Sequence, residues 1–211
     1  MPNINIETFV DQLARSGTDP DATNQYLYGP ATNAIRRANL GHYLEAMTKH
    51  KPETLLVMEA PGYRGCRLTG VPVTSRKILL DGLPELDVFG AGYQDVPEPG
   101  FEHIQGEQSA TIVWGTLREL GVVPLIWNTF PFHPHRMNAP LTNRKPRKPE
   151  TALGMTFLRD IIDWFGVSQI IAVGNVAHDT LRAMDIHCDK VRHPAQGGKN
   201  DFVAGLNALL G

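Results

Sequence analysis

The sequence predicts an α/β protein, a three-layer α/β/α sandwich around a central four-stranded parallel sheet. From about residue 54 to the C-terminus, short apolar runs alternate with segments whose apolar residues recur at helical spacing. Strands that alternate with helices pair in parallel through right-handed crossovers, which places helices on both faces of the sheet. A length of 211 residues suits one domain over residues 1–211, and no repeat or linker divides it.

Two helices are predicted before the first strand, and we expect residues 1–50 to pack on the sheet. Apolar residues recur at helical spacing over Ile4–Ser16 and again over Ala31–His50. The segment between them, residues 17–30, is rich in Asp, Asn, Thr, Gly and Pro, which is typical of a loop.

The remaining elements follow from the same patterns. The predicted strands are Thr54–Glu59, Val122–Trp127, Gln169–Val173 and, more weakly patterned, His187–Arg192. The predicted helices are Arg76–Asp81 with Thr74 or Ser75 as N-cap, Gln108–Leu120 ending at Gly121, Thr151–Phe165, Val176–Met184, and a last helix capped by Asn200 that runs to Leu210. Residues 84–105 and 129–149 are long connections without periodicity, and the first of these suggests no function.

Composition excludes several classes of protein. The chain has only two cysteines, Cys66 and Cys188, so a disulfide framework is not expected and a four-cysteine metal or iron–sulfur site within one chain is impossible. No apolar stretch approaches the roughly 20 residues that span a bilayer, and residues 1–5 do not resemble a signal peptide. We therefore expect a cytoplasmic protein without a membrane partner.

Polar residues stand at the ends of three predicted strands. Glu59 ends the first apolar run, Asn128 follows the second, and His193 follows the last. Because parallel strands bring their carboxyl ends to one edge of the sheet, and ligands bind outside that edge, these side chains could share one pocket. Each residue alone also has an ordinary structural explanation, namely a turn or a loop.

These motifs, in this order, resemble the uracil-DNA glycosylase superfamily. The resemblance is carried by Glu59-Ala60-Pro61-Gly62 after a strand, then Gly70-Val71-Pro72-Val73-Thr74-Ser75, then a strand ending at Asn128, then His193-Pro194. The first motif is most similar to the E-A-P-G form of the iron–sulfur branch. Because the cluster cysteines are missing, the resemblance is to an outlying bacterial branch without the cluster.

The resemblance implies a monofunctional enzyme that hydrolyses the N-glycosidic bond of uracil in DNA during base-excision repair, leaving an abasic site. Glu59 would stabilise the oxocarbenium-like sugar and position water, His193 would donate to the base oxyanion, and Asn128 would distinguish uracil from cytosine. The rest of the base site would be Ala60, Pro61, Gly62, Tyr63 and Val73. No metal or organic cofactor is implied, and we expect a monomer that binds single- or double-stranded DNA.

The expected DNA contacts are mostly basic. No Asp or Glu occurs between residues 120 and 149, whereas Arg and Lys cluster near the end of that segment. The wedge that fills the space of the flipped base would be Gln196, in the loop after the His motif. The candidates for contact with DNA are Arg64, Arg76, Arg144, Lys145, Gln196, Gly197 and Lys199, with Arg67, Arg147 and Lys148 nearby.

Departures from the family pattern leave other functions open. Val73 stands where an aromatic ring usually stacks on uracil, so either Phe130, Phe132 or Tyr63 supplies that ring or base binding is weaker. Tyr63 also lies one place after the position of the thymine-excluding Tyr, and Ala195 replaces a common Ser. One alternative is therefore a binder of uracil-containing or abasic DNA without turnover. A less favoured one is a zinc-dependent hydrolase or deaminase using His133 and His135 with Glu59 or His193. A small-molecule nucleotide enzyme ranks lowest, because no phosphate-loop fingerprint occurs.

Overall fold

The sheet of this computed structural model, which describes residues 5–211, contains four parallel strands in the order β3-β2-β5-β6. They are β2 (Thr54–Met58), β3 (Leu125–Asn128), β5 (Gln169–Val173) and β6 (Asp189–Val191). The α/β fold class and the parallel sheet that the sequence predicts are confirmed. The prediction for Ile4 lies outside the described residues.

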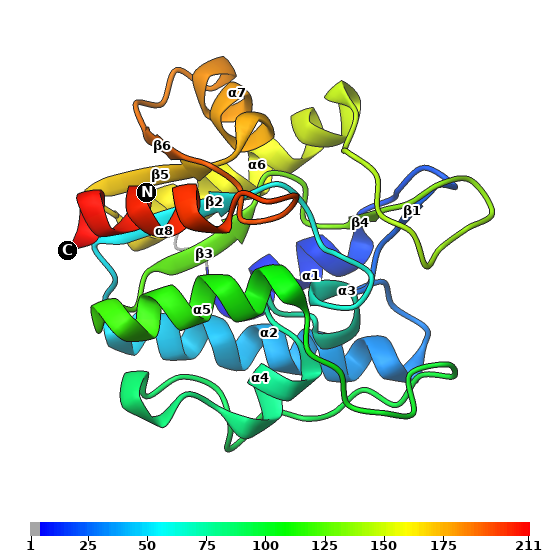
Figure 1. Cartoon of the computed structure of the whole chain (residues 1–211). Coiled ribbons are helices and arrows are strands. Elements are labelled where there is room, and N and C mark those ends of the chain that lie inside the picture. The colour runs from blue at the N-terminus through cyan, green and yellow to red at the C-terminus, as the bar shows by residue number, and fades with distance from the viewer. Residues whose placement is uncertain (1–4) are drawn as a thin grey trace.

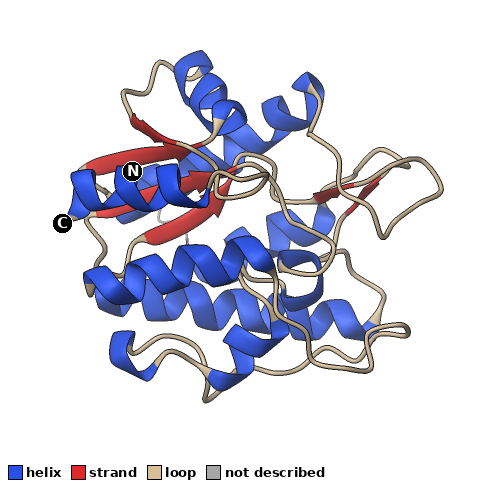
Figure 2. Ribbon diagram, viewed as in Figure 1, coloured by secondary structure: helices blue, strands red, loops and turns tan. Residues whose placement is uncertain are grey.

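Helices cover the sheet on both sides, and Figures 1 and 2 show α8 in front of the strands and α6 behind them. The α-helices are α1 (Ile6–Arg15), α2 (Ala31–His50), α3 (Cys66–Thr69), α4 (Arg76–Asp81), α5 (Gln108–Leu120), α6 (Lys148–Phe165), α7 (Asn175–Ala183) and α8 (Lys199–Leu210), and a 3-10 helix covers Pro84–Leu86. The chain therefore has the three layers that strand–helix alternation predicts.

The strand order reverses at β2, and this determines where a ligand can bind. β2 comes first in the sequence but lies inside the sheet, between β3 on one side and β5 on the other. The connection from β2 leads toward β3, whereas the connection from β5 leads the other way toward β6. These opposite directions open a crevice at the carboxyl ends of β2 and β5. Glu59 follows β2 directly, so it stands at this crevice.

The N-terminal helices pack on the sheet through aromatic residues. The ring of Phe9 in α1 meets Trp127 of β3 edge-on at 5.3 Å between centroids, and it also contacts Phe157 of α6. The hydroxyl of Tyr43 in α2 donates to the carbonyl of Ile126 and accepts from its amide. Leu55, Leu56 and Val57 of β2 are fully buried, as a strand covered on both faces requires.

Several boundaries differ from the prediction for local reasons. The second strand begins at Leu125, directly after Pro124, which lacks the N–H that a sheet ladder needs. Ser75 is the N-cap of α4, whereas α8 begins at Lys199 without the expected side-chain cap from Asn200. None of the described helices is both long enough and apolar enough to cross a bilayer.

Two predicted loops contain a small sheet. β1 (Ala22–Thr23) pairs antiparallel with β4 (His133–Pro134), with Ala22 opposite Pro134 and Thr23 opposite His133. A strand of two residues has no periodicity, so the sequence pattern could not indicate it. The pairing ties the segment after β3 to the N-terminal region and thereby fixes the start of the long connection 129–149.

Candidate active site

A cavity of about 440 Å3 lies at the carboxyl edge of the sheet, and Glu59, Asn128 and His193 all line it. The strands that precede these residues are β2, β3 and β6, which are not all neighbours in the sheet. The structure therefore brings together the three side chains that the sequence places at strand ends. Their chemical roles remain predictions.

Glu59 presents a carboxylate that no described residue pairs with. Its backbone is held by the segment after β3, because its carbonyl oxygen accepts from the Thr129 hydroxyl at 2.6 Å and from the amide of Phe130 at 3.2 Å. Burial raises the pKa of the Glu59 carboxyl, and the nearby ammonium of Lys145 opposes this shift. Glu59 is thus a fixed and incompletely solvated carboxylate, which makes it more basic than a surface glutamate.

Asn128 is nearly buried, with 3% of its surface exposed, at the last position of β3 opposite Met58. Among the described residues, none forms a hydrogen bond with its side-chain amide. A buried amide usually has partners, because leaving it unpaired costs about 1–3 kcal/mol. The amide is therefore available to a ligand as a donor and an acceptor.

His193 has a defined tautomer. Its Nδ1 accepts a hydrogen bond from the amide of Ala195 at 3.1 Å, so the proton of the neutral ring is on Nε2. Burial lowers the pKa of His193; Glu107 opposes this shift and Arg192 adds to it. The neutral imidazole can then donate from Nε2 without carrying a charge.

Two glycines make room for His193. A Cβ atom on Gly174, which has a φ of +90°, would lie 3.2 Å from the Cβ of His193. A Cβ atom on Gly198 would lie 2.1 Å from the His193 carbonyl oxygen, a clash that no rearrangement of side chains relieves. Gly174 also donates its amide to Val191, which ties the end of β5 to the end of β6. These glycines position the histidine.

The loop after Glu59 forms one wall of the cavity. Ala60, Pro61 and Gly62 line it, as predicted, but Tyr63 is not among the lining residues and packs against Phe101 instead. The amide of Tyr63 donates to Oδ1 of Asn143 at 3.0 Å, so this N–H is not free for a base or a phosphate.

Val73 lines the cavity in the left-handed backbone region, with a φ of 49°. This conformation is strained for a β-branched residue. The carbonyl of Val73 accepts a hydrogen bond from the indole N–H of Trp114 at 2.8 Å, which helps to hold it.

No Phe, Tyr or Trp occurs among the described residues that line the cavity. The expectation that Phe130 or Phe132 supplies a stacking ring is wrong, because both rings are buried in the core and pack against each other. The apolar part of the wall comes instead from Val73, Met58 and Val176.

Two of the predicted phosphate contacts are corrected, because their guanidinium groups already have partners. Arg76 is 5% exposed, pairs with Asp95 and donates to the carbonyl of Phe101. Arg67, named beside them in the sequence, is also buried and binds Glu98 at 2.6 Å. Buried, paired guanidinium groups of this kind stabilise the fold and are not available to DNA.

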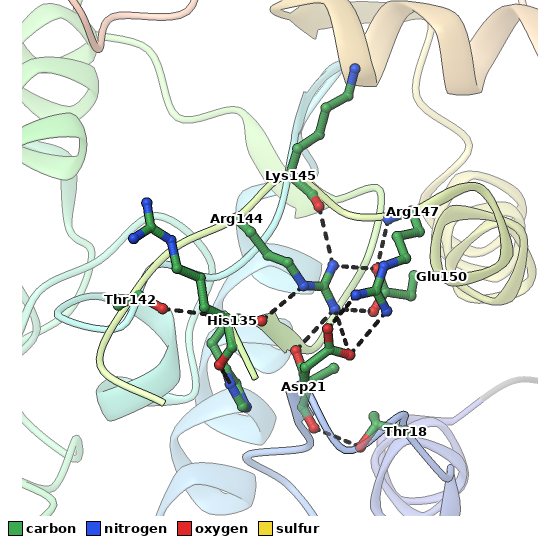
Figure 3. A network of polar contacts seen from close by, with 10 residues as sticks. Thr18, Asp21, His135, Thr142, Arg144, Lys145, Arg147 and Glu150 are labelled. Carbon is green, nitrogen blue, oxygen red and sulfur yellow. Dashed lines mark hydrogen bonds and ion pairs between the residues drawn. The ribbon is translucent and has the colours of Figure 1, made fainter. Parts of the chain in front are cut away.

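Arg144 is the second predicted phosphate contact that the structure corrects (Figure 3). Its guanidinium binds Glu150 at 2.5 and 2.7 Å, and it also donates to the carbonyls of His135 and Asp21. Arg147 binds Asp21 from the other side. We call these four residues, Asp21, Arg144, Arg147 and Glu150, the arginine network.

The remaining DNA candidates are exposed. Lys145 lines the cavity, and its side chain extends away from the arginine network in Figure 3. Gln196 also lines the cavity, whereas Arg64, Gly197 and Lys199 are exposed outside it. Their contact with DNA remains a prediction.

The zinc site considered for His133 and His135 does not form. Nδ1 of His133 lies 2.7 Å from the carbonyl of Pro61 and its Nε2 lies 3.0 Å from that of Pro140, so both ring nitrogens are engaged. Within residues 5–211, the group of possible metal ligands is Asp19, Asp21 and Glu150. The arginine network already neutralises two of these carboxylates.

The fold is similar to that of a solved structure, wild-type SMUG2 of Pedobacter heparinus. The TM-score is 0.59 at 16% sequence identity, over 95% of this chain and 97% of that chain. No protein-family model and no curated protein matches the sequence. At this identity the likeness to SMUG2 shows the fold alone.

Sequence reasoning missed several residues of the cavity: Glu107, Ser109, Asn143, Gly174 and Arg192. Gly174 carried a usable signal, because it follows the third strand just as Asn128 ends the second. Asn143 lies in a long connection without periodicity and Glu107 lies just after another, so nothing in the sequence placed them near the sheet edge. Glu107 accepts hydrogen bonds from the amides of Ser109 and Ala110 and thereby caps α5.

Proposed function

We propose that this protein is a DNA glycosylase that hydrolyses the N-glycosidic bond of uracil in DNA. The observation that carries the proposal is the convergence of an unpaired carboxylate, an unpaired amide and an imidazole with a free Nε2–H on one cavity. The likeness in fold to SMUG2 supports it at the level of the superfamily.

In the proposed reaction the bond between C1′ of the sugar and the base breaks, and the electron pair leaves with the base. Glu59 stabilises the positive charge that develops on the sugar and orients a water molecule, whose oxygen bonds to C1′ and whose proton passes to the carboxylate. Nε2–H of His193 donates to the base oxygen on which negative charge develops. A donor of this kind contributes on the order of 3 kcal/mol to the barrier.

Asn128 is proposed to select the base. Its amide can donate to a uracil carbonyl and accept from the neighbouring ring N–H, whereas cytosine presents the opposite pattern. A mismatched base would leave the amide unpaired at a position that is only 3% exposed. An Asn128→Asp variant should therefore lose most of its preference for uracil over cytosine.

The partner is proposed to be uracil-containing DNA, bound by a monomer with the damaged nucleotide turned out of the helix. Lys145 and Gln196 at the cavity are the nearest candidates for contact with the strand, and Arg64 and Lys199 lie farther out. Phosphate contacts of this kind position the strand and do not read its sequence.

The test is cleavage of a labelled oligonucleotide that contains one uracil, followed by alkali. The wild type should give abasic product, and Glu59→Gln and His193→Ala should each lower the single-turnover rate by about 10²-fold or more. Glu53→Gln and His187→Ala, which change the same residue types away from the cavity, should leave the rate unchanged. A wild type that gives no product would contradict the proposal.

A second candidate, binding without turnover, is favoured by one observation. The described cavity wall has no aromatic ring to stack on a base, and Ala195 offers no hydroxyl. The same oligonucleotide in a gel-shift assay separates the two: retained binding with no strand breaks would support the binder.

A further inference from the structure

A loop beside the cavity combines rigidity, exposed apolar side chains and unpaired cations. We name residues 135–145 the finger loop. Figure 1 shows it between β4 and α6, extending beyond the edge toward which the strands of the sheet point. Asn143, Arg144 and Lys145 at its end line the cavity, so the loop and the cavity share a rim.

Hydrogen bonds within the loop fix its tip. Arg136 and Ala139 form an isolated antiparallel bridge around a tight turn, in which Asn138 has a φ of 57°. The hydroxyl of Thr142 accepts from the amide of Arg136 at 3.0 Å and donates to the carbonyl of Ala139 at 2.7 Å. The tip is therefore a closed turn rather than a flexible end.

Both ends of the loop are also anchored. Before the tip, the amide of His135 donates to the carbonyl of Asp21 at 2.9 Å, and the ring of His133, just outside the loop, contacts the carbonyl of Pro140 at 3.0 Å. After the tip, Asn143 accepts from the amide of Tyr63, and Arg144 is held in the arginine network, as Figure 3 shows. The loop thus has a fixed position relative to the cavity.

Two large apolar side chains remain outside this framework. Met137 at the tip is 55% exposed and Leu141 is 49% exposed. Leu141 precedes Asn143 by two residues, so its Cα lies within about 7 Å of that of a cavity residue. The ordered loop thus holds two large apolar side chains in solvent at the rim.

The charges around them indicate which partner they meet. Arg136 and Lys145 flank the apolar side chains, and neither has an ion-pair partner within residues 5–211. No carboxylate occurs from residue 121 to residue 149. Apolar side chains between cations match duplex DNA, where phosphates take the charges and a base step takes the apolar group.

We infer that the finger loop is a DNA wedge, in which Leu141, assisted by Met137, enters the duplex at the step vacated by the flipped nucleotide. The inference rests on the proposed function, and it transfers the wedge role that the sequence suggested for Gln196. Gln196 lines the cavity and is followed directly by two glycines, whereas Leu141 is apolar and rigidly held. Leu141 would act on flipping, and not on bond cleavage.

The test measures binding to a duplex that carries a non-cleavable abasic-site analogue, with 2-aminopurine next to it, and to the single strand of the same sequence. We expect Leu141→Ala to weaken duplex binding about 10-fold, with loss of the change in 2-aminopurine fluorescence, and to leave single-strand binding unchanged. Leu27→Ala, which shortens a side chain of similar exposure (46%) elsewhere, is the matched control and should behave as the wild type.

Three results would overturn the inference: unchanged duplex binding by both Leu141→Ala and the Met137→Ala, Leu141→Ala double variant, equal weakening of single-strand and duplex binding, or no duplex binding by the wild type. Because this assay needs no turnover, its outcome is independent of the cleavage assay. A protein that gives no abasic product can still show the wedge, and a glycosylase can lack it.

Discussion

Two polar regions lie next to each other in this protein and differ in how their charges are used. In the arginine network, Asp21 and Glu150 are 3% and 5% exposed, and each accepts from a guanidinium. In the cavity, which Arg144 of the network also lines, Glu59 and Asn128 have no hydrogen-bond partner for their side chains among the described residues. In the network both carboxylates are paired with arginines, whereas in the cavity the carboxylate and the amide have no partner within the described residues.

The comparison shows that a charged or polar side chain can bind a ligand only where it has no partner within the protein. A buried ion pair contributes little net stability but is costly to break. A polar group that faces a cavity without a protein partner is free to bind a ligand there. Arg144 and Lys145 are neighbours in the sequence and both line the cavity, yet Arg144 is paired with Glu150 whereas Lys145 has no ion-pair partner among the described residues.

One substitution made at two positions should separate the regions most strongly. We expect Glu150→Gln to lower the free energy of unfolding by about 3 kcal/mol, because Arg144 loses its two closest carboxylate contacts and keeps only Asp21 at 3.2 Å. Glu59→Gln should leave stability within about 0.5 kcal/mol or raise it, because it removes an unpaired, partly buried carboxylate. Urea unfolding at pH 7 measures both values.

The exposed Glu119→Gln is the control for a change of charge alone. If Glu150→Gln and Glu59→Gln had equal effects on unfolding, the distinction between a paired and an unpaired carboxylate would not hold.

The contact of His133 with the cavity wall at Pro61 and with the finger loop at Pro140 should be sensitive to pH. Burial lowers the pKa of His133 from 6.5 to about 4, although the carbonyls of Pro61 and Pro140 oppose this shift, and the charge of Arg67 and the neighbouring His135 add to it. The unfolded chain therefore binds a proton first as the pH falls. The stability that the neutral ring contributes is complete above pH 6.5 and declines between pH 6.5 and 4, by about 3 kcal/mol in all.

A His133→Asn variant should lose this part of the pH dependence while other titrating groups remain. The measurement is urea unfolding at several pH values from 4 to 8. A variant with the same slope as the wild type over this range would show that His133 does not titrate between the folded and unfolded states.

A glycine substitution should affect the cavity specifically. Gly174→Ala places a Cβ atom 3.2 Å from the Cβ of His193 at a φ of +90°. We expect a loss of about 2 kcal/mol in stability and about a 10-fold lower cleavage rate, because the imidazole must shift. Gly121→Ala has a φ of +68° with nothing within 4 Å, so it should lose about 1 kcal/mol and keep its rate.

If the rates of the two glycine variants fell equally, the loss would reflect strain in general and not the position of His193. Rates measured well below each variant's melting temperature exclude unfolding as the cause.

The fold was largely predictable from local patterns. Buried strands such as Thr54–Met58 are continuous apolar runs, and their alternation with amphipathic helices determines a parallel sheet. The strand order was not predictable in this way, although it places the crevice at β2. The two-residue strands β1 and β4 were missed because such short segments have no period.

The candidate site was predictable where it depends on strand ends and unpredictable where it depends on long connections. Glu59, Asn128 and His193 reach one cavity because sheet geometry gathers the ends of parallel strands. Whether an arginine is free to bind DNA, in contrast, depends on partners that are distant in the sequence. Arg76 pairs with Asp95, and Arg147 pairs with Asp21, 126 positions away. A cluster of basic letters cannot show which members are already paired.

The smallest expected effect concerns Asn143, a cavity residue that directly precedes Arg144 of the network. Its Oδ1 accepts from the amide of Tyr63, and its Nδ2 would lie 3.8 Å from a Cβ atom on Gly62, at the cavity wall. Asn143→Ala should raise KM for the uracil oligonucleotide about 5-fold with little change in kcat, the cost of about one hydrogen bond. Asn207→Ala on the exposed face of α8 should change neither value.

Asn143→Asp distinguishes the two roles of that side chain. The aspartate keeps an acceptor for the Tyr63 amide but has no N–H to offer the cavity. If Asn143 acts only by holding the loop after Glu59, the Asp variant should recover the wild-type KM. If its Nδ2 donates to the bound base, KM should stay raised. Asn143 would then have one paired atom, Oδ1, and one atom available to the ligand, Nδ2.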